Sequence, residues 1–149
     1  MKREVQMVIN RLNKIPYHLR EKERKKILRK SAKPLVRAAK ANVPRSNKPT
    51  HRYKNGKIVA TYFPGNLRRS IKVLPLRRTT NVFVGPHAKG GAGNFKGRRV
   101  DGYYAHFVEK GTVFQKGIHY MGNAYQSTKE EVFRLIRTGV TDALKTYIR

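Results

Sequence analysis

The chain has 149 residues, no cysteine, and a formal net charge of +27 from 35 Lys and Arg against 8 Asp and Glu. The missing cysteine excludes disulfides, thiolate metal sites and a thiol nucleophile. No apolar run approaches the ~20 residues of a membrane span. The opening MKREVQMVIN is too polar for a signal peptide, so we expect a soluble protein made inside the cell.

The positive charge is concentrated in the middle of the chain. Between Glu23 and Asp101 the sequence holds no acidic residue. Such a field attracts polyanions, and one compact domain that carries it repels itself unless counter-charges lie close by. We therefore expect a polyanion or an acidic protein as partner, and the length fits a single domain over residues 1–149.

Two helices are predicted at the start of the chain. Apolar residues recur at helical spacing over 4–13, and a second stripe runs through 18–42. Pro34 lies inside the second helix and removes a backbone hydrogen bond, so we expect a kink near Arg29–Lys30. Pro44 should end that helix.

The next segment reads as an arm followed by strands. Asn55-Gly56 is a tight-turn signal inside a polar arm over about 45–63, which we expect to be mobile. The runs NLRRSIKVLPL (66–76) and NVFVGP (81–86) have the composition of paired antiparallel strands. The stretch 87–102 combines five glycines with four basic residues and is predicted to be a mobile loop.

The chain ends in a predicted helix. Ser127 and Glu130 have capping-box spacing, and an apolar stripe continues from there almost to the terminus. Gly139 lies inside it and lowers helix stability by roughly 1 kcal/mol relative to Ala. The order of elements predicts an α+β fold, with an antiparallel sheet packed against N-terminal and C-terminal helices.

Little in the sequence points to catalysis. Of the eight carboxylates, only Asp101 and Glu109 fall near predicted loops, whereas enzymes need a convergent set of reactive groups. His106 and Glu109 are three apart, but two ligands do not make a metal site. The glycine-rich loop lacks the spacing of a phosphate-binding P-loop. We predict a protein that is not an enzyme and that needs no cofactor and no metal.

Contact with nucleic acid is a second interpretation of the charge. Phosphates can be neutralised by the basic runs Arg68-Arg69, Arg77-Arg78 and Lys96-Gly97-Arg98-Arg99, and bases could stack on Tyr53, Tyr62, Phe63 and Phe95. A solvated surface with core aromatics explains the same residues. The contact residues that we predict, for nucleic acid or for a partner protein, are Arg52, Lys96, Arg98 and Arg99.

The order of four local motifs resembles the tail-completion or head-tail joining proteins of tailed bacteriophages, the minor tail component family of lambdoid siphophages. The motifs are KPLVRAAKANVP (33–44), GNLRRSI (65–71), YYAHFVEKGT (103–112) and HYMGNAY (119–125). The residues that match the family pattern are Gly65, Leu67, Ser70, Ile71, Tyr104, Ala105, Val108, Glu109, Gly111 and Thr112.

The resemblance covers about residues 25–145, and it departs from the family in the last motif and in two insertions. It implies a virion structural protein of the neck, made in the host cytoplasm and located in the virion, which forms a homo-oligomeric ring between the portal side and the tail. Implied partners are other neck, portal-side and tail proteins, with nonspecific contact to packaged DNA and no membrane. The alternative is a basic nucleic-acid-binding module of ribosomal or nucleoid type.

Glu109 is conspicuous in so basic a chain. If its segment is a helical turn, Tyr104, Ala105 and Val108 would pack inward and Gly111 would permit a left-handed stop. A carboxylate at the end of that turn can accept backbone N–H bonds or meet an arginine. We favour a structural acceptor over a catalytic role.

Overall fold

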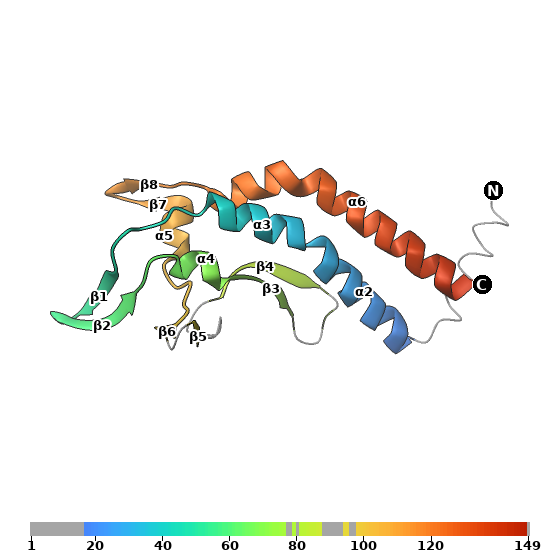
Figure 1. The fold of residues 1–149 in the computed structure, drawn as a ribbon, viewed down its shortest axis with the longest axis horizontal. Helices are drawn as coiled ribbons and strands as arrows, with labels where there is room; N and C mark the ends of the chain where they lie inside the picture. The colour runs from blue at the N-terminus through green and yellow to red at the C-terminus, as the bar shows by residue number, and fades with distance from the viewer. Residues whose placement is uncertain (1–16, 77–78, 80, 88–93, 96–97, 149) are drawn as a thin grey trace.

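Three helices dominate the computed structural model, which describes residues 17–76, 79, 81–87, 94–95 and 98–148. Helices α2 (Tyr17–Ser31) and α3 (Lys33–Asn42) follow each other end to end. Helix α6 (Tyr120–Ile148) runs antiparallel to both and contacts both along its length (Figure 1). The predicted helix at 4–13 lies outside the described residues. None of the described helices has both the length and the apolar character needed to cross a bilayer.

The helical run predicted for 18–42 is interrupted, but not where we expected. The break lies at Ala32 and not at Arg29–Lys30. Pro34 has no N–H for the Lys30 carbonyl and its ring crowds that carbonyl, so the distortion falls within the turn between them. The C-terminal end agrees with prediction, because Val43 before Pro44 is extended, with φ −69° and ψ 127°.

The central strand pair begins later than the sequence suggested. Residues Asn66–Ser70 form a short helix, α4, and only Ile71–Pro75 form strand β3. Gly65 has φ 75° and its carbonyl accepts the Arg69 N–H, which turns the chain into the helix. Strand β4 (Val82–Pro86) pairs with β3 in the predicted antiparallel arrangement, with Val73 opposite Val84. This hairpin contacts α2 and α3.

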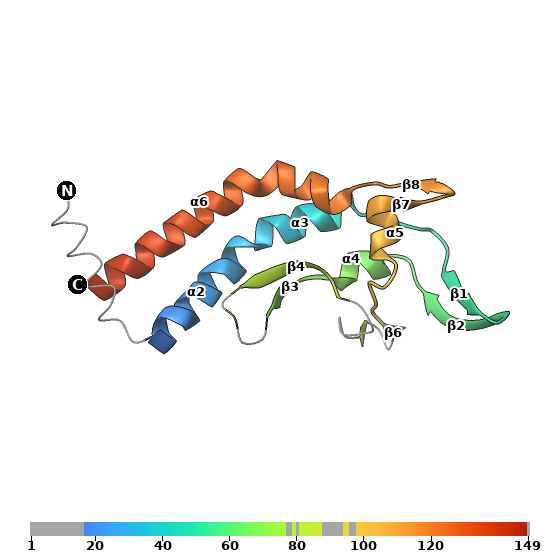
Figure 2. The same cartoon turned by 180° about the vertical axis from the view of Figure 1, so that it is seen from behind.

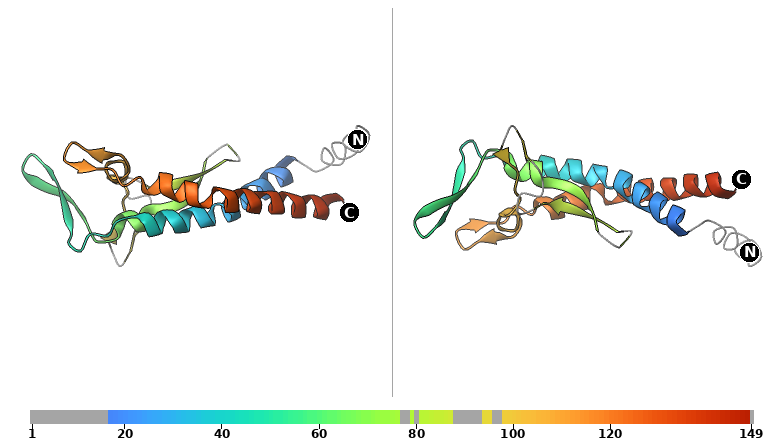
Figure 3. Two further views of the ribbon diagram at one scale, coloured as in Figure 1. Left: turned by 90° about the horizontal axis from the view of Figure 1, so that it is seen from above. Right: turned by 90° about the horizontal axis from the view of Figure 1, so that it is seen from below.

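Two hairpin arms project from the same end of the molecule, away from the start of α2 and the end of α6 (Figures 1 and 2). The first arm pairs β1 (Thr50–Lys54) with β2 (Lys57–Tyr62). Its predicted turn at Asn55-Gly56 is confirmed, because both residues have positive φ. The second arm pairs β7 (Gly111–Thr112) with β8 (Gln115–Lys116). Seen from above and from below, both arms extend beyond the same end of the helices (Figure 3).

The glycine-rich stretch 87–102 contains a short strand pair that the sequence did not predict. Strand β5 (Asn94–Phe95) pairs with β6 (Arg98–Arg99). Strands of only two residues in a glycine-rich segment are too short to give a recognisable alternation of apolar and polar residues. The α+β class is confirmed, and the described strands form four separate two-stranded antiparallel pairs.

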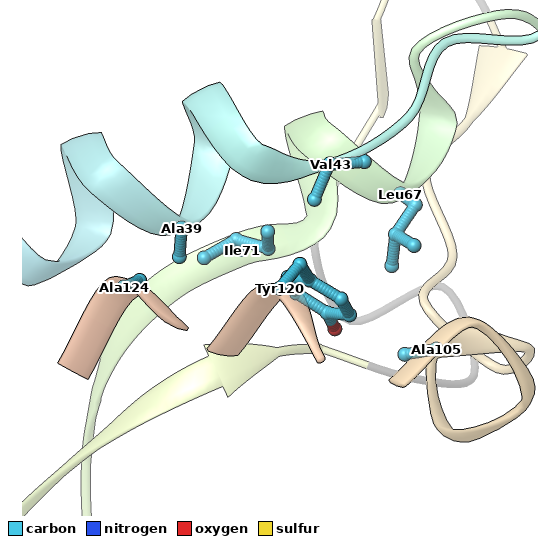
Figure 4. Packing of buried hydrophobic residues seen from close by; sticks show 7 residues of the cluster. All are labelled: Ala39, Val43, Leu67, Ile71, Ala105, Tyr120 and Ala124. Carbon is cyan, nitrogen blue, oxygen red and sulfur yellow. The ribbon is translucent and has the colours of Figure 1, made fainter. Parts of the chain in front are cut away.

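A small hydrophobic core joins the helices to β3. Figure 4 shows the Tyr120 ring of α6 close to Ile71 of β3 and Val43 at the end of α3. Tyr120 is 1% exposed and Ile71 is fully buried. The complete cluster is Ala39, Val43, Leu67, Ile71, Ala105, Tyr120 and Ala124.

Helix α6 starts at Tyr120, so the start predicted at Ser127 is wrong. The Ser127 hydroxyl instead donates to the Ala124 carbonyl within the helix, at 3.0 Å. Gly139, which weakens the helix intrinsically, has a packing reason. A Cβ there would lie 2.8 Å from Cγ2 of Ile27, so the glycine lets α2 and α6 approach closely.

Candidate functional site

The carboxylate of Glu109 lies at the start of α6. Glu109 is in the last turn of helix α5 (Ala105–Lys110). Its Oε2 accepts the Met121 N–H at 2.9 Å and its Oε1 accepts the Gly122 N–H at 3.1 Å. These are two of the four N–H groups that a helix leaves without an internal partner. The negative charge also faces the positive end of the helix dipole.

The backbone around Glu109 holds this geometry. The Glu109 carbonyl accepts the His119 N–H at 3.1 Å, and the Val108 carbonyl accepts the Ile118 N–H at 2.9 Å. His119 precedes α6 with φ 53°. The side chain that caps α6 therefore belongs to Glu109, ten residues before His119, and not to His119 itself.

The two motifs at 65–71 and 103–112 are hydrogen-bonded to each other. The Tyr104 hydroxyl accepts the Leu67 N–H at 3.1 Å. The side chain of Asn66, which is 3% exposed, accepts the Asp101 N–H at 3.0 Å and donates to the Asp101 carbonyl. Sequence reasoning missed Asn66, because nothing local marks its partner 35 residues away.

The other motif residues lie where they support this junction. Leu67, Ser70 and Ile71 are buried, Ala105 is buried, and Val108 packs against the core. Gly65 and Gly111 have φ of 75° and 89°. Thr112 is exposed, and its hydroxyl accepts the Phe114 N–H at 3.3 Å. The helical turn expected around Glu109 is present as α5.

The predicted contact residues are placed in different ways. The Arg52 guanidinium of β1 lies 4.2 Å from the centre of the Tyr103 ring, a cation–π contact that ties the first arm to the segment before α5. Arg98 and Arg99 form β6. Lys96 lies outside the described residues.

His106 and Glu109 do not converge on a common point. The His106 ring lies against the Phe107 ring at a tilt of 40°, with centroids 3.8 Å apart, while the Glu109 carboxylate faces α6. Within the described residues, no three His, Asp or Glu side chains gather in a way that could hold a metal ion.

A pocket of about 660 Å³ lies between the first arm and α5. Aromatic side chains line much of it, and the ring centroids of Tyr62 and Tyr104 are 4.9 Å apart. Arg45, His51 and Arg52 add basic groups to the lining. Pockets lined by aromatic side chains with a few polar groups are the usual form of a binding site. The aromatic members are Tyr62, Phe63, Tyr103, Tyr104 and Phe107.

Burial raises the pKa of Tyr120 to about 12, and the nearby Glu109 charge and Tyr104 add to the shift. The neutral phenol is therefore favoured in the folded state. Because the folded pKa lies above the ordinary value of 10, this stabilisation is complete below pH 10 and disappears as pH rises towards 12.

We expect Tyr120→Phe to remove this alkaline sensitivity. Between pH 10 and 12 the parent should lose about 2 to 3 kcal/mol of unfolding free energy relative to the variant, since one pKa unit is about 1.4 kcal/mol. Urea denaturation of both proteins at pH 8, 10, 11 and 12 measures the difference. Lysine titration affects both proteins equally, so a difference that does not change with pH would contradict the prediction.

Comparison with protein families gives a match that covers most of the chain. A protein-family model described as "Bacteriophage HK97-gp10, putative tail-component" matches residues 6–111. The matched segment includes the motif at 65–71 and the motif at 103–112 as far as Gly111, which are the two segments that hydrogen-bond to each other. Neither the curated proteins nor the solved structures gave a match.

Proposed function

Because this chain belongs to the HK97-gp10-like family of bacteriophage tail components, we propose that it is a structural protein of the phage neck. In this role it forms a homo-oligomeric ring that completes the tail and joins it to the portal side of the head. Its work is assembly and not catalysis. The family match favours this role over a free-standing nucleic-acid-binding module.

The main support for this proposal is the exposure of apolar residues at the tip of the second arm. Val113 and Phe114 form the turn between β7 and β8, and their side chains are 96% and 98% exposed. A soluble monomer gains nothing from two apolar side chains held fully in water at the end of a hairpin. Exposed apolar groups on a projecting element are typical of an interface with another protein.

The first arm supports the same interpretation. All five residues of β1 are exposed, and Tyr53 and Ile58 are large side chains more than half exposed. Both arms leave the body at one end (Figure 3). The exposed residues of the two arms are available for contacts with another protein. In a ring, each subunit could use its arms to contact the next subunit.

The tip of the second arm offers a direct test. We expect the parent protein to form rings at moderate salt, and Val113→Ser combined with Phe114→Ser to be monomeric by light scattering and electron microscopy. The substituted side chains are almost fully exposed, so the thermal midpoint should change little.

A matched control is available on α6. Phe133→Ser combined with Val140→Ser removes the same residue types from positions that are 55% and 45% exposed. This control should still form rings. A parent that is monomeric at every concentration and is absent from purified virions would overturn the proposal. Rings in the arm-tip variant would show that the second arm is not the contact.

A further inference from the structure

A basic hollow of about 710 Å³ lies where the segment after α3 passes α4. Lys40 comes from α3, Arg45 follows Pro44, and Arg68 and Arg69 come from α4. Ser46 and Asn47 are polar members of the lining. The sequence had marked Arg68 and Arg69 as able to neutralise phosphates, whereas it had singled out neither Lys40 nor Arg45.

The charged side chains that line the basic hollow are all positive. No carboxylate is among the described residues that line it. Lys40, Arg68 and Arg69 are half-buried, so their charges are screened less by water than those of surface lysines. Holding four cations around one hollow raises the free energy of the folded state. A ligand that carries several negative charges offsets that cost.

Local contacts build the hollow before any ligand arrives. The Arg69 guanidinium donates to the Pro64 carbonyl at 2.8 Å. A Cβ on Gly65 would lie 2.9 Å from the Arg69 Nη1, so the glycine leaves room for the guanidinium. The Ser46 hydroxyl donates to the Lys48 carbonyl at 2.6 Å and accepts the Lys48 N–H at 3.2 Å, which folds the facing segment into a turn. Preorganised groups lose less entropy when they bind.

We propose that the basic hollow binds the phosphates of a nucleic-acid backbone, and that duplex DNA is its ligand. Arginine guanidinium groups match phosphate oxygens in a two-pronged geometry. Duplex DNA carries one charge per ~1.7 Å of its axis and so brings several anions to one hollow. A single acidic side chain brings only one. The choice of duplex over other nucleic acid rests on the proposed function, because a neck ring surrounds the path of the genome.

The test compares two variants that have lost equal charge. The hollow variant combines Lys40→Gln, Arg45→Gln and Arg68→Gln. The control combines Arg134→Gln, Arg137→Gln and Lys145→Gln, which are exposed positions in the half of α6 away from α4 (Figure 1). Arg69 is left intact because of its contact with Pro64. Affinity for a fluorescent 20-base-pair duplex is measured by anisotropy across a salt series.

The hollow variant should bind the duplex about 10- to 100-fold more weakly than the parent. Its slope of log affinity against log salt should be shallower by about 2 to 3, since each lost phosphate contact removes ~0.9. The control should change affinity less than about threefold, because its charges lie outside the contact.

Two results would overturn the proposal. Equal losses in both variants would mean that the attraction is spread over the whole charge. Unchanged duplex binding in the hollow variant, with loss of binding to poly-glutamate, would assign the hollow to an acidic protein. Circular dichroism establishes that each variant is folded.

A second measurement needs no substitution: the rate of lysine acetylation in the parent protein with and without duplex. Bound duplex should slow acetylation of Lys40 at least severalfold and leave Lys145 unchanged. Equal rates at Lys40 with and without duplex would contradict the proposal. Both measurements use the purified protein, whereas ring formation and presence in the virion test the proposed function. Failure of one is therefore distinguishable from failure of the other.

Discussion

Replacing Glu109 with alanine should lower the unfolding free energy by about 2 to 3 kcal/mol, since hydrogen bonds to a charged group contribute about 1.5 to 3 kcal/mol. The variant leaves the Met121 and Gly122 N–H groups without the acceptor that now binds them at 2.9 and 3.1 Å. Met121 is half-buried, so water replaces the carboxylate poorly there. Favourable charge at the helix start is lost as well. Urea denaturation followed by circular dichroism measures the change.

Glu109→Gln separates charge from shape. The glutamine amide has one acceptor oxygen, and its NH₂ group would face an N–H donor, so we expect a loss of about 1 to 2 kcal/mol. Glu131→Gln removes an exposed carboxylate of α6 and serves as the matched control, with a change below about 0.5 kcal/mol. A Glu109→Gln protein as stable as its parent would show that the carboxylate does not organise this junction.

Features set by neighbouring residues were predictable from the sequence. The Asn55-Gly56 turn needs two residues that accept positive φ, and both have it. The end of α3 follows from the restriction that Pro44 places on Val43. The helical turn before Gly111 follows from the spacing of its apolar residues. In each case the cause and its effect lie within a few residues.

Features set by distant partners were not predictable. Helix α6 begins at Tyr120 because Glu109 supplies its acceptors, so the local capping signal at Ser127 was misleading. Residues 66–70 are helical because Asn66 is fixed to Asp101 and Leu67 to Tyr104. The helix propensities of residues 66–70 contain no information about either bond. Tertiary contacts decided the element type at both places.

The basic hollow shows the same limit for a binding site. The acid-free stretch between Glu23 and Asp101 predicted a polyanion partner, and the hollow lies within that stretch. The set of cations that converge depends on how the end of α3 packs beside α4. The spacing of residues in the sequence does not predict that packing. Charge totals and the Arg68-Arg69 pair therefore predict the class of ligand and part of the site, whereas only the fold adds Lys40 and Arg45.

Gly111→Ala should be the most damaging single substitution at the junction between α5 and the second arm. Gly111 has φ 89° and ψ −175°, a conformation that is essentially restricted to glycine. A Cβ would lie 2.5 Å from the Gln115 carbonyl oxygen and equally close to the Gly117 nitrogen, both backbone atoms. Strain and overpacking together should lower the unfolding free energy by about 3 to 5 kcal/mol. Urea denaturation measures this loss.

The same substitution at Gly122 should have the opposite sign. Gly122 lies in the first turn of α6, and a Cβ there would meet only the Glu109 Oε1 at 3.7 Å, an ordinary contact. Alanine gains up to about 1 kcal/mol over glycine in a helix, so Gly122→Ala should be neutral or stabilising. Because the two glycines lie on either side of the Glu109 contact, the pair separates backbone strain from a general sensitivity of the region. Equal destabilisation of both variants would mean that the left-handed turn at Gly111 is not what holds the arm to the body.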